Sequence, residues 1–199
     1  MMGMLASLAL VRLGRFRGKM SFAGMITAPL VMPEVITGLS LLLLFVAMEK
    51  SFGWPGGRGM LTIWIAHVTF STAFVTVILS SRLKEIDRSL EEAGMDLGAS
   101  PLKVFFVITI PIITPALLAA WLLAFTLSLD DLVIASFVSG PGSTTLPMKV
   151  FSSVRLGISP KINALASIII ALVSLGVLTA GWIIRGWERK KTMGISQKT

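Results

Sequence analysis

The sequence contains no cysteine and only one histidine, His67. Disulfide frameworks, thiolate metal sites and metal sites built from several histidines are therefore excluded. Charged residues are also scarce, at 14% of the chain, against about 25% in ordinary soluble domains. Apolar residues make up 54% of the 199 residues, and the mean hydropathy is +0.86. This composition is typical of an integral membrane protein.

Two kinds of catalytic motif are missing as well. In the ATP-binding pattern G-x-x-x-x-G-K-[ST], glycines and a lysine hold phosphates. Its nearest approach here is Gly18-Lys19, which is followed by Met20 and has Leu13 in the place of the first glycine. There is no G-x-S-x-G motif either, so an intramembrane hydrolase is a weak hypothesis. We expect no enzyme activity, no metal and no cofactor bound by this chain.

Long apolar stretches dominate the rest of the chain. A helix needs about 20 apolar residues to cross a bilayer, and residues 22–48, 60–80, 104–129 and 162–184 qualify. Residues 1–11 are apolar but too short, and they lack the basic start and cleavage site of a signal peptide. We expect one all-α, polytopic transmembrane bundle over residues 1–199, N-terminally truncated, with 1–11 as a partial helix.

Lysine and arginine predict the orientation of these spans, because basic residues accumulate in cytoplasmic loops. If residues 12–19 are cytoplasmic, alternation places 81–103 and 185–199 on the same side. These three segments hold 13 of the 18 basic residues. The loop 81–103 and the C-terminus are therefore predicted to be cytoplasmic. The net charge of +8 is explained by these topology signals, so nucleic acid is not an expected partner.

Prolines interrupt two of the predicted spans. Pro29 and Pro33 lie in the first, and Pro111 and Pro115 lie in the third. A proline inside a helix removes a hydrogen bond and kinks the helix. In lipid this is tolerated where neighbouring protein or a cavity satisfies the freed carbonyl. The kinks are either packing features or bends that line a pathway, and the sequence leaves both interpretations open.

The loop 81–103 contains a polar segment that predicts a short helix. Ser89 and Glu92 match a capping box, with Ser89 as the N-cap. Gly98 suits the turn after the helix, and Ser100-Pro101 suits the start of the next one. The apolar residues at helical spacing are Ile86, Leu90, Ala93 and Leu97. Such a helix either lies on the membrane surface or is presented to a partner.

A spacing pattern favours the second interpretation. It runs Glu92-Ala93-Gly94, three residues, Gly98, nine residues, Ile108, one residue, Ile110-Pro111. It resembles the cytoplasmic loop of ABC importer permeases, in which alanine and leucine occupy positions 94 and 110. Residues 27–38, 125–134 and 139–147 resemble the corresponding segments of polyamine importer permeases, most of all those of putrescine importers.

The resemblance implies a bacterial inner-membrane permease with the type I ABC importer fold. The residues that it implies for coupling to the ATPase are Glu92, Ala93, Gly94, Gly98, Ile108 and Pro111. The implied partners are an ATPase subunit dimer that uses ATP and Mg²⁺, a second permease subunit, an extracytoplasmic polyamine-binding protein and membrane lipid. The alternative is an ATP-independent channel or secondary carrier for organic cations, which leaves the loop pattern unexplained.

Three carboxylates are candidates for the path of a cationic substrate. Glu34 lies within the first span, and Asp130 and Asp131 lie at the end of the third. Ionisable residues in spans are functional hypotheses, and a desolvated cation needs carboxylates or aromatic faces. Alternatively, Glu34 satisfies backbone freed by the prolines, and an aspartate caps the following helix. His67 is predicted to be a hydrogen-bonded core residue.

Overall fold

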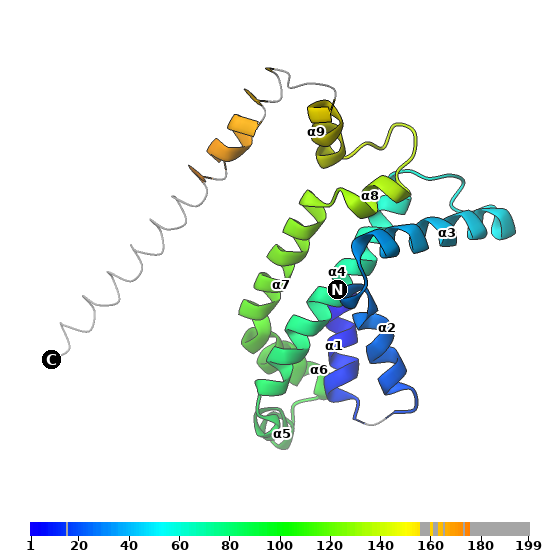
Figure 1. Ribbon diagram of the computed structural model, residues 1–199. Helices are drawn as coiled ribbons and strands as arrows, with labels where there is room; N and C mark the ends of the chain where they lie inside the picture. Colours follow the sequence, from blue (N-terminus) through cyan, green and yellow to red (C-terminus); the bar gives the residue numbers. More distant parts are fainter. Residues whose placement is uncertain (15, 156–159, 161–162, 165, 173, 176–199) are drawn as a thin grey trace, which may run out of the picture. The chain divides into compact units, whose positions relative to one another are not determined.

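The computed structural model describes residues 1–14, 16–155, 160, 163–164, 166–172 and 174–175, and the elements found among them are helical (Figure 1). Residues 1–148 form one compact unit, which the following paragraphs describe. Its helices are α1 (Met2–Arg12), α2 (Lys19–Val31), α3 (Glu34–Phe52), α4 (Met60–Glu85), α5 (Arg88–Asp96), α6 (Pro101–Val104), the π-helical segment η1 (Phe105–Thr109), α7 (Ile110–Asp130) and α8 (Val133–Val138). Helix α9 (Leu146–Arg155) begins at its end. The prediction of one domain over residues 1–199 stays a prediction.

Three helical segments in the described part are long and apolar enough to cross a membrane. They are α3, α4 and the continuous run from α6 to α7, Pro101–Asp130. The predicted spans 60–80 and 104–129 lie within the second and third of these. The partial helix predicted over 1–11 is α1, and the predicted span 162–184 lies mostly outside the described residues.

The prediction of one continuous span over residues 22–48 is wrong. The chain forms two helices there, α2 and α3, with a break at Met32 and Pro33. A residue before a proline is driven out of the helical conformation by the proline ring, and Met32 is extended, with ψ 137°. Pro33 then sets the start of α3, and Figure 1 shows α3 running across the direction of α2.

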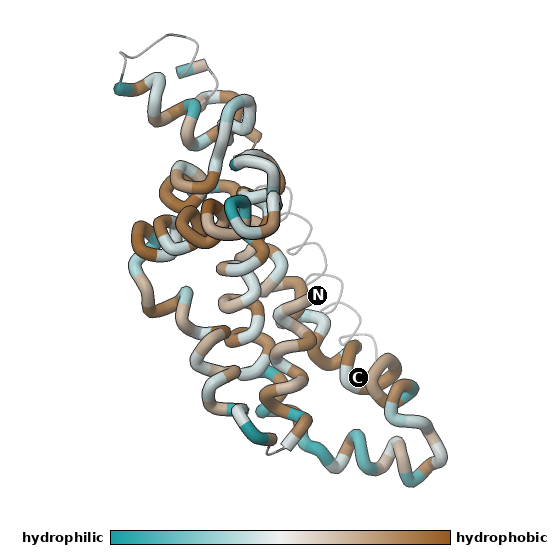
Figure 2. The backbone as a smooth tube through the Cα atoms, turned by 90° about the vertical axis from the view of Figure 1, so that its right-hand side faces the viewer, coloured by the Kyte–Doolittle hydropathy of each residue, from teal (hydrophilic) through white to brown (hydrophobic). Residues whose placement is uncertain are grey.

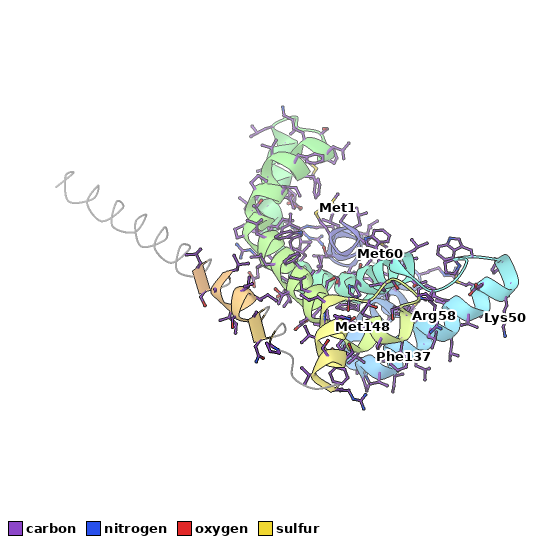
Figure 3. The ribbon with its side chains drawn as sticks, turned by 90° about the horizontal axis from the view of Figure 1, so that it is seen from above. Met1, Lys50, Arg58, Met60, Phe137 and Met148 are labelled. Atoms are coloured by element: carbon purple, nitrogen blue, oxygen red, sulfur yellow. The ribbon has the colours of Figure 1, made fainter. Side chains whose placement is uncertain are left out.

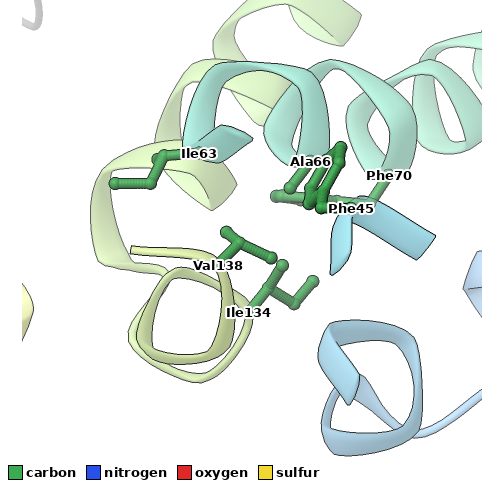
Figure 4. Packing of buried hydrophobic residues seen from close by; sticks show 6 residues of the cluster. All are labelled: Phe45, Ile63, Ala66, Phe70, Ile134 and Val138. Carbon is green, nitrogen blue, oxygen red and sulfur yellow. The ribbon is translucent and has the colours of Figure 1, made fainter. Parts of the chain in front are cut away.

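Helix α4 is the central element of the unit, and it packs against α1, α2 and α7. At one end of α4, Phe45, Ile63, Ala66, Phe70, Ile134 and Val138 form a buried cluster that joins α3, α4 and α8 (Figure 4). Nearer the other end, Leu83, Ile86 and Ile113 form a second cluster with α7. Figure 2 shows that the helices are mainly hydrophobic and that hydrophilic residues gather at the end that carries α5.

Much apolar surface of these helices stays uncovered within the unit. Trp64 and Trp121 are 63% and 61% exposed, and Leu118 is 57% exposed. An exposed apolar surface of this kind indicates contact with a membrane or another protein. The helices therefore have the surface of a membrane-embedded bundle.

The loop before α4 and the loop after α8 are in close contact, at the end of the unit opposite α5. Arg58 lies in the first loop, Met60 is the first residue of α4, and Phe137 belongs to α8 (Figure 3). The hydroxyl of Thr62 donates to the carbonyl of Val138 at 2.6 Å. The backbone of Gly140 lies so close to Arg58 that an added Cβ atom would be 1.9 Å from the Arg58 carbonyl oxygen. This contact holds α8 against the start of α4.

Candidate functional site

The three predicted carboxylates line a single cavity of about 420 Å³. Glu34 comes from the start of α3, and Asp130 and Asp131 come from the junction of α7 and α8. The other lining residues are Pro29, Leu30, Met32, Pro33, Thr37, Phe70, Phe74, Leu127, Leu132, Val133 and Ile134. Residues that are about 100 positions apart in the sequence therefore share one site.

The helix break caused by Pro33 places Glu34 at this site. The break at Met32 and Pro33 makes Glu34 the first residue of α3, and all three residues line the cavity. A carboxylate in the first turn of a helix is stabilised by the unpaired backbone N–H groups and the helix dipole. Pro29 and Pro33 line this cavity, which favours a bend that lines a pathway over a packing feature for these two prolines.

The two adjacent aspartates have different surroundings. The carboxylate of Asp131 accepts from the backbone N–H groups of Ile134 at 3.1 Å and Ala135 at 2.8 Å, which are unpaired donors at the start of α8. It also contacts Nε2 of His67 at 3.0 Å. Within the described residues, the side chain of Asp130 has no hydrogen-bond or ion-pair partner, and it is exposed. Asp131 is thus held in place, whereas Asp130 is available to a ligand.

His67 connects α4 to this junction. Because a carboxylate only accepts hydrogen bonds, Nε2 of His67 donates to Asp131. The other ring nitrogen, Nδ1, is 2.7 Å from the hydroxyl of Ser128 on α7. The prediction that His67 is a hydrogen-bonded core residue is confirmed. Its function is to keep the end of α7 in position against α4.

Sequence reasoning missed the aromatic wall of the cavity. Phe70 and Phe74 lie edge to face, with ring centroids 6.4 Å apart. They follow His67 on one face of α4 at positions i+3 and i+7, and this helical spacing was the signal that could have identified them. An aromatic ring attracts a cation through its negatively charged face. The cavity therefore combines aromatic rings with the carboxylates of Glu34 and Asp130, which have no protein partner among the described residues.

At the opposite end of the unit, α5 forms the short helix that was predicted in the loop 81–103. The predicted N-cap, Ser89, is wrong: the helix begins at Arg88, two residues earlier than expected, and Asp87 caps it by accepting from the backbone N–H of Ser89 at 3.0 Å. This hydrogen bond lowers the pKa of the Asp87 carboxyl below its ordinary value. Gly98 makes the turn after α5, with φ +83°, as its position predicted.

The residues with predicted coupling roles fall on two sides of α5. Glu92 and Ala93 are exposed, whereas Gly94 is buried against Val104 and Ile108. A Cβ atom on Gly94 would be 2.8 Å from Cδ1 of Ile108, which explains why a glycine fits here. Pro111 lies in the first turn of α7.

The apolar stripe of α5 faces outward, away from the rest of the unit. Leu90 is 49% exposed and Leu97 is 90% exposed, and Ala93 between them is exposed as well. Only Ile86, before the helix, is buried. Leu90, Ala93 and Leu97 lie on one helix face at positions i, i+3 and i+7. This face has the chemistry of a docking surface and is not covered by the described residues.

The chain is similar to a known family and to several known proteins. Residues 1–192 match the family described as "Binding-protein-dependent transport system inner membrane component". The chain is 65% identical over 196 residues to the putrescine transport system permease protein PotI of Escherichia coli (strain K12), which covers 98% of this chain and 70% of that protein. It is 40% identical over 194 residues to the spermidine/putrescine transport system permease protein PotC of the same strain, with 98% and 69% covered. A PotC homolog of Mycoplasma pneumoniae is 36% identical over 174 residues, with 87% and 59% covered.

Proposed function

Because this chain belongs to the family of binding-protein-dependent transport system inner membrane components, we propose that it is the permease subunit that carries putrescine or a related polyamine across the bacterial inner membrane. The observation that carries the proposal is the cavity at the α2–α3 and α7–α8 junctions. Its carboxylates without a protein partner, Glu34 and Asp130, are suited to the ammonium groups of a diamine. The relatives whose names include putrescine support the same substrate class.

The cavity favours a cation with an apolar middle. A diamine has charged ends joined by methylene groups, so it needs anionic groups for the ends and apolar contacts between them. Phe70, Phe74 and Leu127 supply apolar lining in the same cavity as the carboxylates. The ammonium groups lose water on entry, and the carboxylates and ring faces replace part of that hydration.

The proposed energy source is a separate ATPase dimer, which uses ATP and Mg²⁺ while this chain binds neither. The exposed face of Leu90, Ala93 and Leu97 is the proposed contact, with Glu92 beside it. Motion of the ATPase would move α5 and switch the cavity between outward and inward access. In this arrangement α5 is cytoplasmic, and the cavity lies toward the opposite side.

Two further partners complete the proposed transporter. A second permease subunit would cover part of the exposed apolar surface, because a substrate path between subunits needs walls from both. An extracytoplasmic binding protein would deliver the polyamine to the side that carries α8. The basic residues support this orientation, because 13 of 18 lie in segments assigned to the cytoplasm.

Competing functions account for less of the structure. An ATP-independent channel or secondary carrier for organic cations would use the same cavity, but it gives no role to the exposed apolar face of α5. A hydrolase would use Ser128, His67 and Asp131 as a relay. Against that reading, both oxygens of Asp131 accept N–H groups from α8, which is what a structural helix cap does.

The proposal is tested with a complex of this chain, its second permease subunit, the ATPase and the binding protein in proteoliposomes. We expect putrescine to stimulate ATP hydrolysis and to accumulate inside the vesicles only when ATP is present. Equal uptake without ATP would favour the channel or carrier. Failure of the ATPase to co-purify with this chain would overturn the proposed mechanism.

The cavity carboxylates give a direct prediction. Glu34→Gln and Asp130→Asn remove negative charge and keep side-chain size, so each is expected to lower the initial rate of putrescine uptake about tenfold, the loss that accompanies a missing charged hydrogen bond. Glu49→Gln is the matched control, because Glu49 is exposed near the other end of α3 and does not line the cavity. Normal uptake by both cavity variants would contradict this role.

The docking face gives a second prediction. Glu92→Lys reverses the charge beside the exposed stripe, at the middle of α5. We expect ATP-driven uptake to fall about tenfold or more, with unchanged amounts of the protein in the membrane. Glu85→Lys, in an exposed pair with Arg82, is the control. Equal effects of the two variants would argue against docking at Glu92.

A further inference from the structure

The carboxylate of Glu91, on the side of α5 that faces the rest of the unit, forms hydrogen bonds to α1 and to η1. Oε1 of Glu91 accepts from Nη2 of Arg12 at 3.0 Å and from the hydroxyl of Thr109 at 2.8 Å. Arg12 is the last residue of α1, and Thr109 is the last residue of η1. The ion pair is largely buried, with 17% and 18% of its two side chains exposed.

A second arginine, on α5 itself, forms another hydrogen bond between α5 and α1. Nη2 of Arg88, on α5, donates to the carbonyl oxygen of Val11 at 3.0 Å. The last carbonyls of a helix have no partner within the helix, so this contact caps α1. Each of the two helices thus contributes one arginine to the other, and α5 cannot move from α1 without breaking charge-assisted hydrogen bonds.

Thr109 differs from several threonines of α4 and α7. Thr69, Thr72, Thr114 and Thr126 donate their hydroxyls to the carbonyl four residues earlier in their own helices. Thr109 instead donates to Glu91, and its side chain is almost fully buried. Its hydroxyl is therefore used to link α5 to the membrane-spanning run that contains α7.

The local helix geometry around Thr109 is also unusual. Residues Phe105–Thr109 form a π-helical turn, in which the N–H of Ile110 donates to the carbonyl of Phe105. Pro111 follows and has no N–H to offer. Short π-helical turns are frequent at functional sites, because they interrupt the regular hydrogen-bond ladder. The hydrogen bond from Thr109 to Glu91 is therefore made at the π-helical turn of the run Pro101–Asp130, where the regular helix is interrupted.

We propose that Glu91 is a positioning residue that transmits movement of α5 to α1 and α7. The inference rests on the proposed coupling function of α5, but it concerns a residue next to the motif position Glu92 and facing the other way. The outer face of α5 contacts the ATPase, and the inner face is held by a partly buried charge pair that salt screens weakly. A displacement of α5 consequently moves both helices.

The main test compares two hydroxyl deletions in the same span. Thr109→Val removes the donor to Glu91, whereas Thr114→Val removes a hydroxyl that bonds only to its own helix. In the complete complex in proteoliposomes, we measure putrescine transported per ATP hydrolysed. We expect this ratio to fall at least about fivefold for Thr109→Val, the lower end of coupling between distant sites, and to stay unchanged for Thr114→Val.

Glu91→Gln and Arg12→Gln extend the test to the ion pair. Each is expected to lower the ratio by a similar factor, and the double variant to lower it no further, because both remove the same interaction. Co-purification of the ATPase and the amount of chain in the membrane are expected to stay at the wild-type level. A role in folding alone would change these two quantities and leave the ratio intact.

The outcomes separate this inference from the proposed function. If the unaltered complex does not couple uptake to ATP hydrolysis, the proposed function fails. If the unaltered complex is coupled and the Glu91→Gln and Thr109→Val complexes keep its ratio, the function stands and the transmission role of Glu91 is overturned.

Discussion

Replacing Gly140 with alanine is expected to destabilise the protein by about 3 kcal/mol or more, because the new methyl group collides with backbone atoms. The Cβ atom would be 1.9 Å from the carbonyl oxygen of Arg58 and 2.6 Å from its carbon. Gly140 cannot easily move away, since its N–H donates to the Ser143 hydroxyl at 2.8 Å and its carbonyl accepts from the same hydroxyl at 2.8 Å. The measurement is the thermal midpoint of the purified chain in detergent.

Two other glycines nearby provide controls for this prediction. Gly59→Ala adds a methyl group in open space on an extended backbone, so the midpoint should change little. Gly142→Ala also meets open space, but its φ of +79° strains a side chain by about 1 kcal/mol. We expect Gly140→Ala to be the most damaging of the three. If it were as stable as Gly59→Ala, the close contact between the two loops would be wrong.

Replacing Asp131 with alanine is expected to cost about 2–4 kcal/mol of stability, the sum of a lost helix cap and an unsatisfied buried donor. The substitution leaves the N–H groups of Ile134 and Ala135 and the Nε2–H of His67 without their acceptor. Because α8 carries part of the cavity wall, putrescine uptake is expected to be lost as well. Thermal midpoint and uptake are both measured.

Asp130→Ala is the adjacent control. Asp130 has no partner among the described residues, so its loss should lower uptake and leave the thermal midpoint within about 0.5 kcal/mol of the unaltered protein, as for other surface positions. Combining Asp131→Ala with His67→Phe should cost less than the sum of the two single changes, because both remove one shared contact. If Asp130→Ala lowered the thermal midpoint and Asp131→Ala did not, the structural role would belong to Asp130 and the ligand-binding role to Asp131.

The helices themselves were largely predictable, because their signals are local. Apolar length identified the spans 60–80 and 104–129, and α4 and the run Pro101–Asp130 contain them. Gly98 and Ser100-Pro101 marked the turn and the restart after α5, since backbone conformation there depends on single residues. The break in the first span was underestimated: apolar length predicted continuity, although Pro33 restricts the residue before it.

Local patterns also misplaced the start of α5. Capping logic selected Ser89, but Asp87 is a competing cap two residues earlier, and the observed helix starts from it. The apolar stripe left open whether Leu90, Ala93 and Leu97 meet the membrane surface or a partner, and the buried positions, Gly94 and in part Glu91, lie outside that stripe. Periodicity shows which residues share a helix face, but it does not show whether that face contacts protein, membrane or solvent.

The sequence by itself determined that this is a membrane protein of helices, and it identified Glu34, Asp130 and Asp131 as unusual carboxylates, because charge is rare in apolar spans. Only the tertiary structure brought them to one cavity and separated the two aspartates. Asp131 caps α8 locally, but it also contacts His67, which is 64 residues away in the sequence. The link from Glu91 to Arg12 likewise joins residues 79 positions apart. Such contacts follow from the packing of whole helices, and no local pattern encodes them.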